Sequence, residues 1–113
     1  MNVEPVCRTV SSPPSRVTVA LVQMRCAREK QANVEKARQR IAEAAASGAN
    51  VVCLPELFAG HYPCQTEDFL RFDEAEPIPG PTSDALAAAA REHGVVVITS
   101  LFERRAAGVY HNT

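Results

Sequence analysis

The sequence lacks both the charge imbalance and the long apolar segments that mark two large classes of protein. Twelve Lys and Arg residues and 13 Asp and Glu residues are scattered over 113 residues, and the formal net charge is -1. A nearly neutral chain without a basic cluster has no electrostatic footprint for nucleic acid or an anionic membrane surface. No apolar run approaches the ~20 residues that span a bilayer. We therefore expect neither nucleic acid nor a membrane as a partner.

Metal-binding and disulfide patterns are also missing, although the chain has four cysteines. Cys7, Cys26, Cys53 and Cys64 form no CxxC pair and no series with histidine at ligand spacing. This spacing is typical of free thiols and predicts neither a zinc site nor a disulfide framework.

Glycine-rich phosphate-binding loops are absent as well. The segment from Gln23 to Lys30, which follows the first predicted strand, has no glycine. A dinucleotide-binding crossover needs a glycine-rich turn there so that the backbone can approach a pyrophosphate. Gly80 lies between two prolines and lacks the lysine and repeated glycines of a P-loop. A nucleotide-binding domain is therefore disfavoured.

The first 16 residues have little that could pack against a core. They contain Glu4 and three prolines and no apolar central region, which excludes a secretory signal peptide. We predict a flexible leader over residues 1–16 and a cytoplasmic location. Residues 17–113 have the length for one domain, and the chain is 46% hydrophobic and 22% charged, as in ordinary globular proteins.

Hydrophobic periodicity predicts a strand, a helix and a second strand. Residues 17–22 are rich in β-branched side chains and are expected to form the first strand. Apolar residues recur at helical spacing over 31–46, with Asn33 or a polar neighbour as N-cap and Gly48 at the stop. The apolar run at 51–54 is typical of a strand buried on both faces. Together they predict a parallel, right-handed βαβ unit.

The next segment predicts a weak helix, a rigid connector and a second strong helix. Residues 65–72 have a faint helical pattern, and residues 76–82 are a proline-rich connector. Thr82 or Ser83 is expected to cap a helix that ends before Gly94. Three apolar side chains of the weak helix are expected to pack beneath the preceding loop: Phe69, Leu70 and Phe72.

The last segment predicts a third buried strand over 95–102, a turn over 103–108 and the start of an antiparallel fourth strand over 109–113. The chain stops within that strand, with no closing helix. A sheet cut there keeps an unpaired apolar edge. The pattern therefore predicts an α/β domain that is incomplete.

A carboxylate stands at the end of the second predicted strand. Pro55 cannot donate to a strand ladder, so the strand stops there and Glu56 follows at its carboxyl end. In open α/β sheets this edge binds ligands, and residues 57–63 are typical of a loop around it. A desolvated carboxylate has a raised pKa, which suits a general base. Pattern alone leaves two interpretations open, a general base or a solvated glutamate.

His61 and Cys64 lie three residues apart in and just after this loop. An imidazole that takes the proton from a neighbouring thiol would create a nucleophile. The alternative is a surface histidine beside an incidental cysteine, which is the more common situation. The spacing by itself favours the second interpretation.

Short motifs follow one another along residues 17–113: Val19–Met24, Asn33 with Lys36–Ala37, Gly48–Ala49, Leu54–Phe58, Ile78–Thr82, Ser100–Glu103 and Tyr110–Thr113. In this order they resemble the amino-terminal part of the nitrilase-superfamily carbon-nitrogen hydrolases. Gly60–Gln65 together with Ser100–Glu103 is most similar to the branch that hydrolyses N-carbamoylputrescine.

The resemblance implies a fold and a mechanism. The fold is an αββα sandwich, of which this chain would supply the amino-terminal part. A Glu-Lys-Cys triad hydrolyses non-peptide carbon-nitrogen bonds without a cofactor: Glu takes the thiol proton, Cys attacks the carbonyl carbon, and Lys stabilises the oxyanion. Glu56 matches the family's glutamate. The Lys and Cys motifs would lie beyond Thr113, and Tyr62 is expected either to line the substrate pocket or to anchor its loop.

The expected activity is hydrolysis of an N-carbamoyl amine, such as N-carbamoylputrescine, to amine, carbon dioxide and ammonia in putrescine biosynthesis. We expect a homo-oligomer in a full-length form. The 113-residue chain alone is expected to be inactive, because the Lys and Cys motifs are missing. The alternative is a non-catalytic remnant or a small α/β interaction module.

Overall fold

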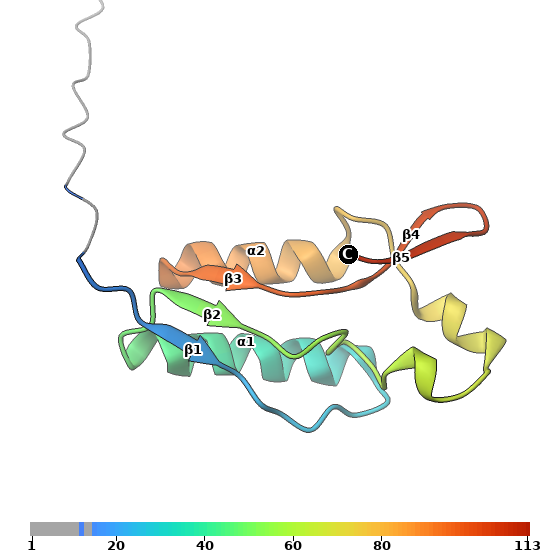
Figure 1. Ribbon diagram of the computed structural model, residues 1–113, viewed down its shortest axis with the longest axis horizontal. Coiled ribbons are helices and arrows are strands. Elements are labelled where there is room, and N and C mark those ends of the chain that lie inside the picture. The colour runs from blue at the N-terminus through green and yellow to red at the C-terminus, as the bar shows by residue number, and fades with distance from the viewer. Residues whose placement is uncertain (1–11, 13–14) are drawn as a thin grey trace, which may run out of the picture.

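The computed structural model describes residue 12 and residues 15–113, so most of the predicted leader lies outside the described residues. Figure 1 shows a sheet with helices along it and a hairpin at one end. The elements are β1 (Val19–Leu21), α1 (Lys30–Ala46), β2 (Val51–Cys53), η1 (Pro63–Gln65), η2 (Phe69–Glu74), α2 (Pro81–His93), β3 (Val96–Ile98), β4 (Phe102–Ala106) and β5 (Val109–Asn112). Within the described residues, no helix is both long enough and apolar enough to cross a membrane.

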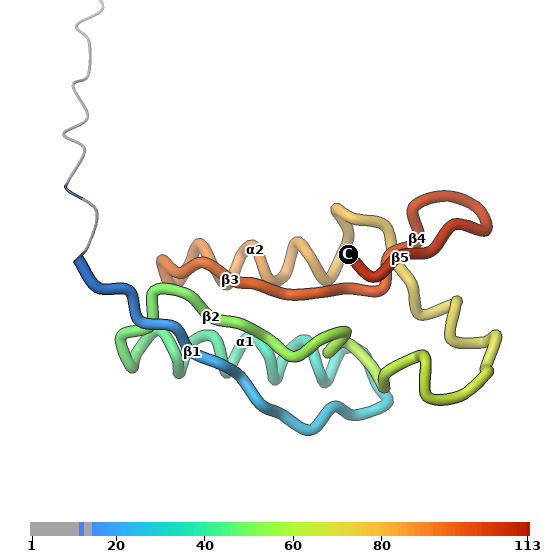
Figure 2. The backbone as a smooth tube through the Cα atoms, in the orientation of Figure 1, coloured from blue at the N-terminus to red at the C-terminus, as the bar shows by residue number. Residues whose placement is uncertain are grey.

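The predicted βαβ unit is confirmed, and α2 extends it to a third strand. β1, β2 and β3 form a parallel sheet in that order, and Val52 is in register with Ala20 on one side and Val97 on the other. Figure 2 follows this path, in which each helix returns the chain to the start of the next strand. The carboxyl ends of all three strands therefore meet at one edge of the sheet.

The core lies between the sheet and the two helices. It contains Val34, Ala37, Ile41, Ala49, Val52, Leu54, Phe58, Leu86, Ala89 and Leu101. α1 contacts α2 as well as β2, so both helices cover the same face of the sheet. Apolar burial on this face is the main favourable contribution to folding.

The prediction that β2 is buried on both faces is wrong for the described residues. Only Val52, which points toward the helices, is fully buried, while Val51 and Cys53 are half-buried. Four apolar side chains of the neighbouring strands are exposed on the face of the sheet to which Val51 and Cys53 belong: Val19, Leu21, Val96 and Ile98. A parallel sheet is covered on both faces when helices or a second layer pack on each side, and here the helices cover one.

Asn33 does not cap α1, contrary to the prediction. The helix begins at Lys30, and Glu29 occupies the N-cap position without a side-chain cap bond. Asn33 is fully buried within the first turns, where its side chain hydrogen-bonds to Ala27 in the loop after β1 and to Ala59 in the loop after Glu56. Gly48 follows the last turn with a φ of 91°, as the predicted stop requires.

The start of α2 differs slightly from the prediction, whereas its end agrees. Gly80 is the N-cap residue, and the Ser83 hydroxyl accepts a hydrogen bond from the Gly80 N–H at 2.8 Å. Thr82 is buried in the first turn and is not the cap. Gly94 ends the helix in the left-handed conformation, with a φ of 64°.

The segment predicted as a weak helix over residues 65–72 forms two separate 3₁₀ turns, η1 and η2. Phe72 packs against Phe102 and Tyr110, with ring centroids 5.8 and 4.6 Å away. Phe69 and Leu70 are 84% and 75% exposed, so the prediction that they pack beneath the loop is wrong.

The predicted strand over residues 95–102 is also wrong in its length. β3 ends at Ile98, and Phe102 begins β4 in a separate antiparallel hairpin with β5. The run breaks at Thr99 and Ser100, because the Ser100 hydroxyl bonds the loop after β2. Most of the predicted turn over 103–108 is therefore strand, and β5 pairs with β4 instead of β3.

Candidate active site

Glu56 lies just beyond β2, at the carboxyl edge of the sheet, and its side chain is exposed. The next residue, Leu57, is buried and has a positive φ of 49°, which is uncommon for a residue with a side chain. Its N–H donates to the Ser100 hydroxyl at 2.9 Å. Such a conformation persists only where the surroundings hold it. The burial of Leu57 and its hydrogen bond to Ser100 therefore fix the backbone next to Glu56.

The Glu56 carboxylate contacts the end of β5. Asn112 Nδ2 donates to Glu56 Oε1 at 2.7 Å. β5 is held there by reciprocal backbone hydrogen bonds between Leu101 and Thr113, at 2.7 and 3.0 Å. Sequence reasoning missed this contact because it paired the last strand with the wrong partner. The available signal was the place of Asn112 in the Tyr110–Thr113 motif.

An open cleft of about 670 Å³ lies between the loop after Glu56 and the hairpin. Its walls include Leu57, Tyr62, Cys64, Phe72 and Asn112, and they are mostly apolar. Such a lining is typical of a small-molecule site in which a few polar groups set the orientation. The structure thus brings the Glu56 loop, η2 and the hairpin together around one space.

Tyr62 lies on the wall of this cleft and is 41% exposed. The pKa of its hydroxyl is raised by the negative charge of the Cys64 thiolate, by that of the Glu56 carboxylate, and by a hydrogen bond with Cys64. A phenol with an ordinary pKa of about 10 is already protonated at neutral pH, and the shift here is in the same direction. Tyr62 can therefore donate a hydrogen bond to a molecule in the cleft.

The structure does not bring His61 and Cys64 together as a catalytic pair. His61 lines a small cavity on the other side of the loop, whereas Cys64 lines the open cleft. No hydrogen bond joins their side chains in the part of the chain that the structure describes. The His61 carbonyl oxygen instead accepts a hydrogen bond from Arg71 at 3.4 Å.

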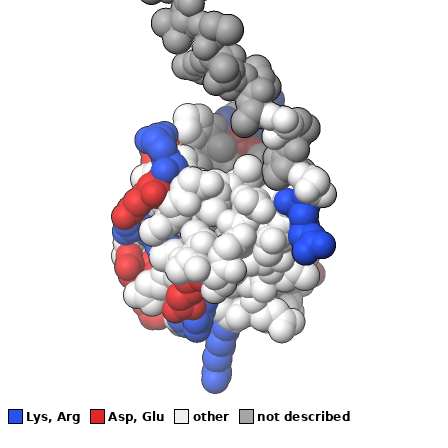
Figure 3. Space-filling view, turned by 90° about the vertical axis from the view of Figure 1, so that its left-hand side faces the viewer, with Lys and Arg blue, Asp and Glu red and all other residues white. Residues whose placement is uncertain are grey.

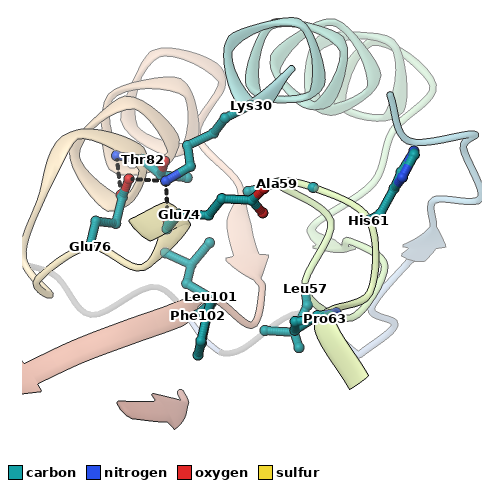
Figure 4. Close-up of a pocket in the computed structure, with 11 residues that line it drawn as sticks. Lys30, Leu57, Ala59, His61, Pro63, Glu74, Glu76, Thr82, Leu101 and Phe102 are labelled. Carbon is teal, nitrogen blue, oxygen red and sulfur yellow. Dashed lines mark hydrogen bonds and ion pairs between the residues drawn. The ribbon is translucent and has the colours of Figure 1, made fainter. Parts of the chain in front are cut away.

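A small cavity of about 30 Å³ lies behind the Glu56 loop and adjoins an ionic cluster. Figure 4 shows the Lys30 ammonium pointing to Glu76, 3.2 Å away, and it also donates to the Glu74 carbonyl oxygen. The other oxygen of Glu76 accepts the Thr82 N–H at 2.7 Å, at the start of α2. One carboxylate thus joins the amino-terminal ends of α1 and α2.

Metal binding and disulfides find no support among the described residues. No group of three or more His, Cys, Asp or Glu side chains there could hold a metal ion. Cys26, Cys53 and Cys64 are free thiols, as predicted, and Cys7 lies outside the described residues. The end of the molecule opposite the hairpin has a mainly uncharged centre with both signs of charge at its rim (Figure 3).

The comparisons with known proteins agree with this geometry. The sequence model of the carbon-nitrogen hydrolase family matches residues 18–113, and the chain belongs to that family. It is 40% identical over 88 residues to the N-carbamoylputrescine amidase of Solanum lycopersicum, covering 77% of this chain and 29% of that protein. It is 34% identical over 99 residues to omega-amidase NIT2-B of Xenopus laevis, covering 88% of this chain and 34% of that protein.

A solved structure places the fold in the same family. The crystal structure of a carbon-nitrogen hydrolase from Helicobacter pylori G27 superposes with a TM-score of 0.75 at 30% sequence identity, covering 85% of this chain and 33% of that one. The predicted fold, the amino-terminal part of a nitrilase-superfamily α/β architecture, is therefore confirmed. The chain spans about a third of the length of these relatives.

Proposed function

We propose that the chain is part of an amidase that hydrolyses an N-carbamoyl amine such as N-carbamoylputrescine. The observation that carries the proposal is the placement of Glu56, which follows the carboxyl end of β2 and whose carboxylate accepts a hydrogen bond from Asn112, a residue that lines the cleft. The sequence similarity to an N-carbamoylputrescine amidase and to an omega-amidase supports the reaction class. We choose the carbamoyl substrate because the identity to the N-carbamoylputrescine amidase, 40%, is higher than that to the omega-amidase, 34%.

In the proposed mechanism Glu56 is the general base. It takes the proton from a cysteine thiol, the sulfur attacks the carbonyl carbon, and a lysine stabilises the oxyanion. Glu56 then gives the proton to the leaving nitrogen, and the carbon-nitrogen bond breaks to release ammonia. Water then releases the remaining carbamoyl group as carbon dioxide and free amine. We assign the base to Glu56 and a wall of the substrate pocket to Tyr62. The resemblance implies that the lysine and the cysteine follow Thr113.

We further propose that residues 17–113 are the amino-terminal part of the hydrolase domain. The exposed Val19, Leu21, Val96 and Ile98 support this, because the second sheet of an αββα sandwich would cover that face. As the resemblance implies, the complete enzyme would work without a cofactor, as a homo-oligomer in putrescine biosynthesis. We also propose the cytoplasmic location that the composition of residues 1–16 predicts. The 113 residues alone would be inactive.

The first test reads the nucleotide sequence downstream of the Thr113 codon. We expect it to encode a lysine motif and then a cysteine at a strand-to-helix turn. A stop codon at that point would favour the non-catalytic alternative, a remnant or an interaction module.

The second test measures ammonia release from N-carbamoylputrescine by the chain expressed with its downstream sequence. Glu56→Gln keeps the shape of the side chain and removes the base, and we expect turnover to fall by roughly two to four decades. Glu92→Gln is the matched control, because Glu92 is an exposed glutamate of α2. Ammonia release near the wild-type rate by a folded Glu56→Gln variant would contradict the proposal.

A further inference from the structure

The contact between Asn112 and Glu56 has a role beyond holding the hairpin to the sheet. We infer that Asn112 is a positioning residue: its amide fixes one oxygen of the Glu56 carboxylate and leaves the other oxygen free to accept a proton. The inference rests on the proposed function, because it assigns Asn112 a task in the same reaction.

Asn112 is well placed to be the rigid partner of the two. Its backbone is paired with Phe102, and the next residue, Thr113, exchanges two hydrogen bonds with the buried Leu101. Phe102 also packs in an aromatic cluster with Phe72 and Tyr110. A short amide side chain on a strand fixed in this way has little freedom.

Both residues are exposed, but Glu56 has the longer side chain and follows the end of β2 instead of lying within a paired strand. Without a partner such a side chain samples several rotamers, and the entropy of ordering it would add to the barrier of the reaction. Within residues 15–113, Asn112 supplies the side-chain hydrogen bond to this carboxylate. In this arrangement the hairpin, through Asn112, orients the Glu56 carboxylate.

The chemical nature of the donor matters as much as its position. A Lys or Arg beside a carboxylate lowers its pKa strongly, which would make it a poor base at neutral pH. A neutral amide orients the charged carboxylate with a smaller effect on its pKa. Asparagine can thus orient the carboxylate of Glu56 without placing a positive charge beside it.

Other titratable groups near Glu56 or around the cleft come from four segments. Tyr62 and Cys64 belong to the loop and η1, and His111 lines the cleft from β5. Three charged residues line the cleft from η2 and the residues before it, Glu67, Asp68 and Arg71, and Arg25 lines a hollow next to Pro55. These groups remain in variants of Asn112. A change in the pH profile that follows substitution of Asn112 therefore reports on its own contact.

The test compares Asn112→Leu and Asn112→Asp in the chain expressed with its downstream sequence. We expect Asn112→Leu to lower kcat by about tenfold to a hundredfold with KM unchanged, the usual effect of losing a hydrogen bond to a charged group. The acid limb of kcat/KM is expected to move to higher pH, because the charged carboxylate loses a donor. Asn112→Asp is expected to shift it further through like-charge repulsion.

A control and a double variant separate positioning from a structural role. Thr113→Val removes a side-chain hydrogen bond from the same strand, to Glu103 at 2.5 Å, and we expect it to leave kcat and the pH profile unchanged. Asn112→Leu added to Glu56→Gln is expected to cause no further loss of kcat, because the amide acts only through that carboxylate.

Two outcomes would overturn the inference. If Asn112→Leu had lower thermal stability but a normal kcat and pH profile, Asn112 would have only a structural role. If Asn112→Leu does not fold, the same comparison is made with Asn112→Asp. An additive loss in the double variant would show that Asn112 acts elsewhere. Failure of the proposed function is distinguishable, because in that case Glu56→Gln itself is active.

Discussion

The side-chain amide of Asn33 donates to the carbonyl oxygen of Ala59 at 3.1 Å, across 26 residues of sequence. The same side chain bonds both backbone groups of Ala27, at 2.7 and 2.8 Å. Asn33 is fully buried in α1. It therefore ties the loop after β1 and the loop after Glu56 to the first turns of one helix, which makes it a support for the candidate active site.

We expect Asn33→Leu to destabilise the folded chain by about 2–4 kcal/mol, because it leaves partly buried backbone groups of both loops without partners. Urea denaturation followed by circular dichroism measures the free energy of unfolding. Gln39→Ala, at an exposed site of the same helix, is the control and is expected to change it by less than about 0.5 kcal/mol. Equal effects of the two substitutions would show that Asn33 is not a support.

The ion pair between Lys30 and Glu76 is expected to couple the two helices more strongly than a surface pair does. The Lys30 side chain is 34% exposed and that of Glu76 is 13%, and Glu76 also accepts the Thr82 N–H. A double-mutant cycle with Lys30→Met and Glu76→Gln is expected to give a coupling energy of about 1 kcal/mol or more.

The matched control for this cycle is the exposed pair of Glu35 and Arg38, whose atoms lie 3.3 Å apart. Its coupling energy is expected to be at most about 0.5 kcal/mol and to fall in high salt. If the Lys30 and Glu76 cycle gave no larger value than this pair, the cluster would not contribute to helix docking.

Gly80 is expected to tolerate no side chain, because of close approach and not because of its dihedral angles. Its φ of -163° is extended backbone, but a Cβ atom there would lie 2.2 Å from the Pro77 carbonyl oxygen. We expect Gly80→Ala to destabilise the chain by about 1–3 kcal/mol, the usual cost of overpacking. Thermal unfolding measures the change, and a melting temperature equal to that of the unsubstituted chain would refute this explanation.

Cys26 is expected to react slowly with alkylating reagents. Burial raises the pKa of its thiol, and the Lys36 ammonium lowers it by a smaller amount. The midpoint of its pH-dependent alkylation is therefore expected to lie higher in the folded chain than in the chain unfolded in urea. Lys36→Met is expected to raise the midpoint further, since it removes the lowering charge. Mass spectrometry of the Cys26 peptide measures both, and a midpoint that falls on folding would contradict the assignment.

The raised pKa of the Cys26 thiol also makes the stability of the folded chain depend on pH. The folded state binds this proton more tightly than the unfolded state does, so its contribution is present below the unfolded thiol pKa, about 8.5. The contribution is lost as pH rises through the folded pKa. We therefore expect the folded chain to lose stability through this group as pH rises above about 8.5, and the contribution of this group to be constant around neutral pH.

Local patterns predicted the helices and the position of Glu56 well. The periodicity over residues 31–46 agrees with α1, Gly94 ends α2, and Pro55 follows the last residues of the second strand. The strand over residues 95–102 failed because hydrophobicity and β-propensity extend through Thr99 and Ser100 with no local stop. In the structure the last ladder bond joins the Leu54 N–H to the Ile98 carbonyl oxygen, Pro55 has no N–H to continue it, and Ser100 instead accepts the N–H of the distant Leu57. A local pattern contains no information on that partner.

The sequence by itself determined where the elements lie and that a carboxylate follows the second strand, because periodicity, proline and glycine act over a few residues. Only the tertiary structure decided what the polar side chains bind. Asn33 bonds the loop after β1 and the loop after Glu56, Glu76 accepts a hydrogen bond from the start of α2, and Asn112 donates to the carboxylate of Glu56. Those contacts join residues far apart in the chain, and they exist only once the register of the hairpin and the packing of the helices are set.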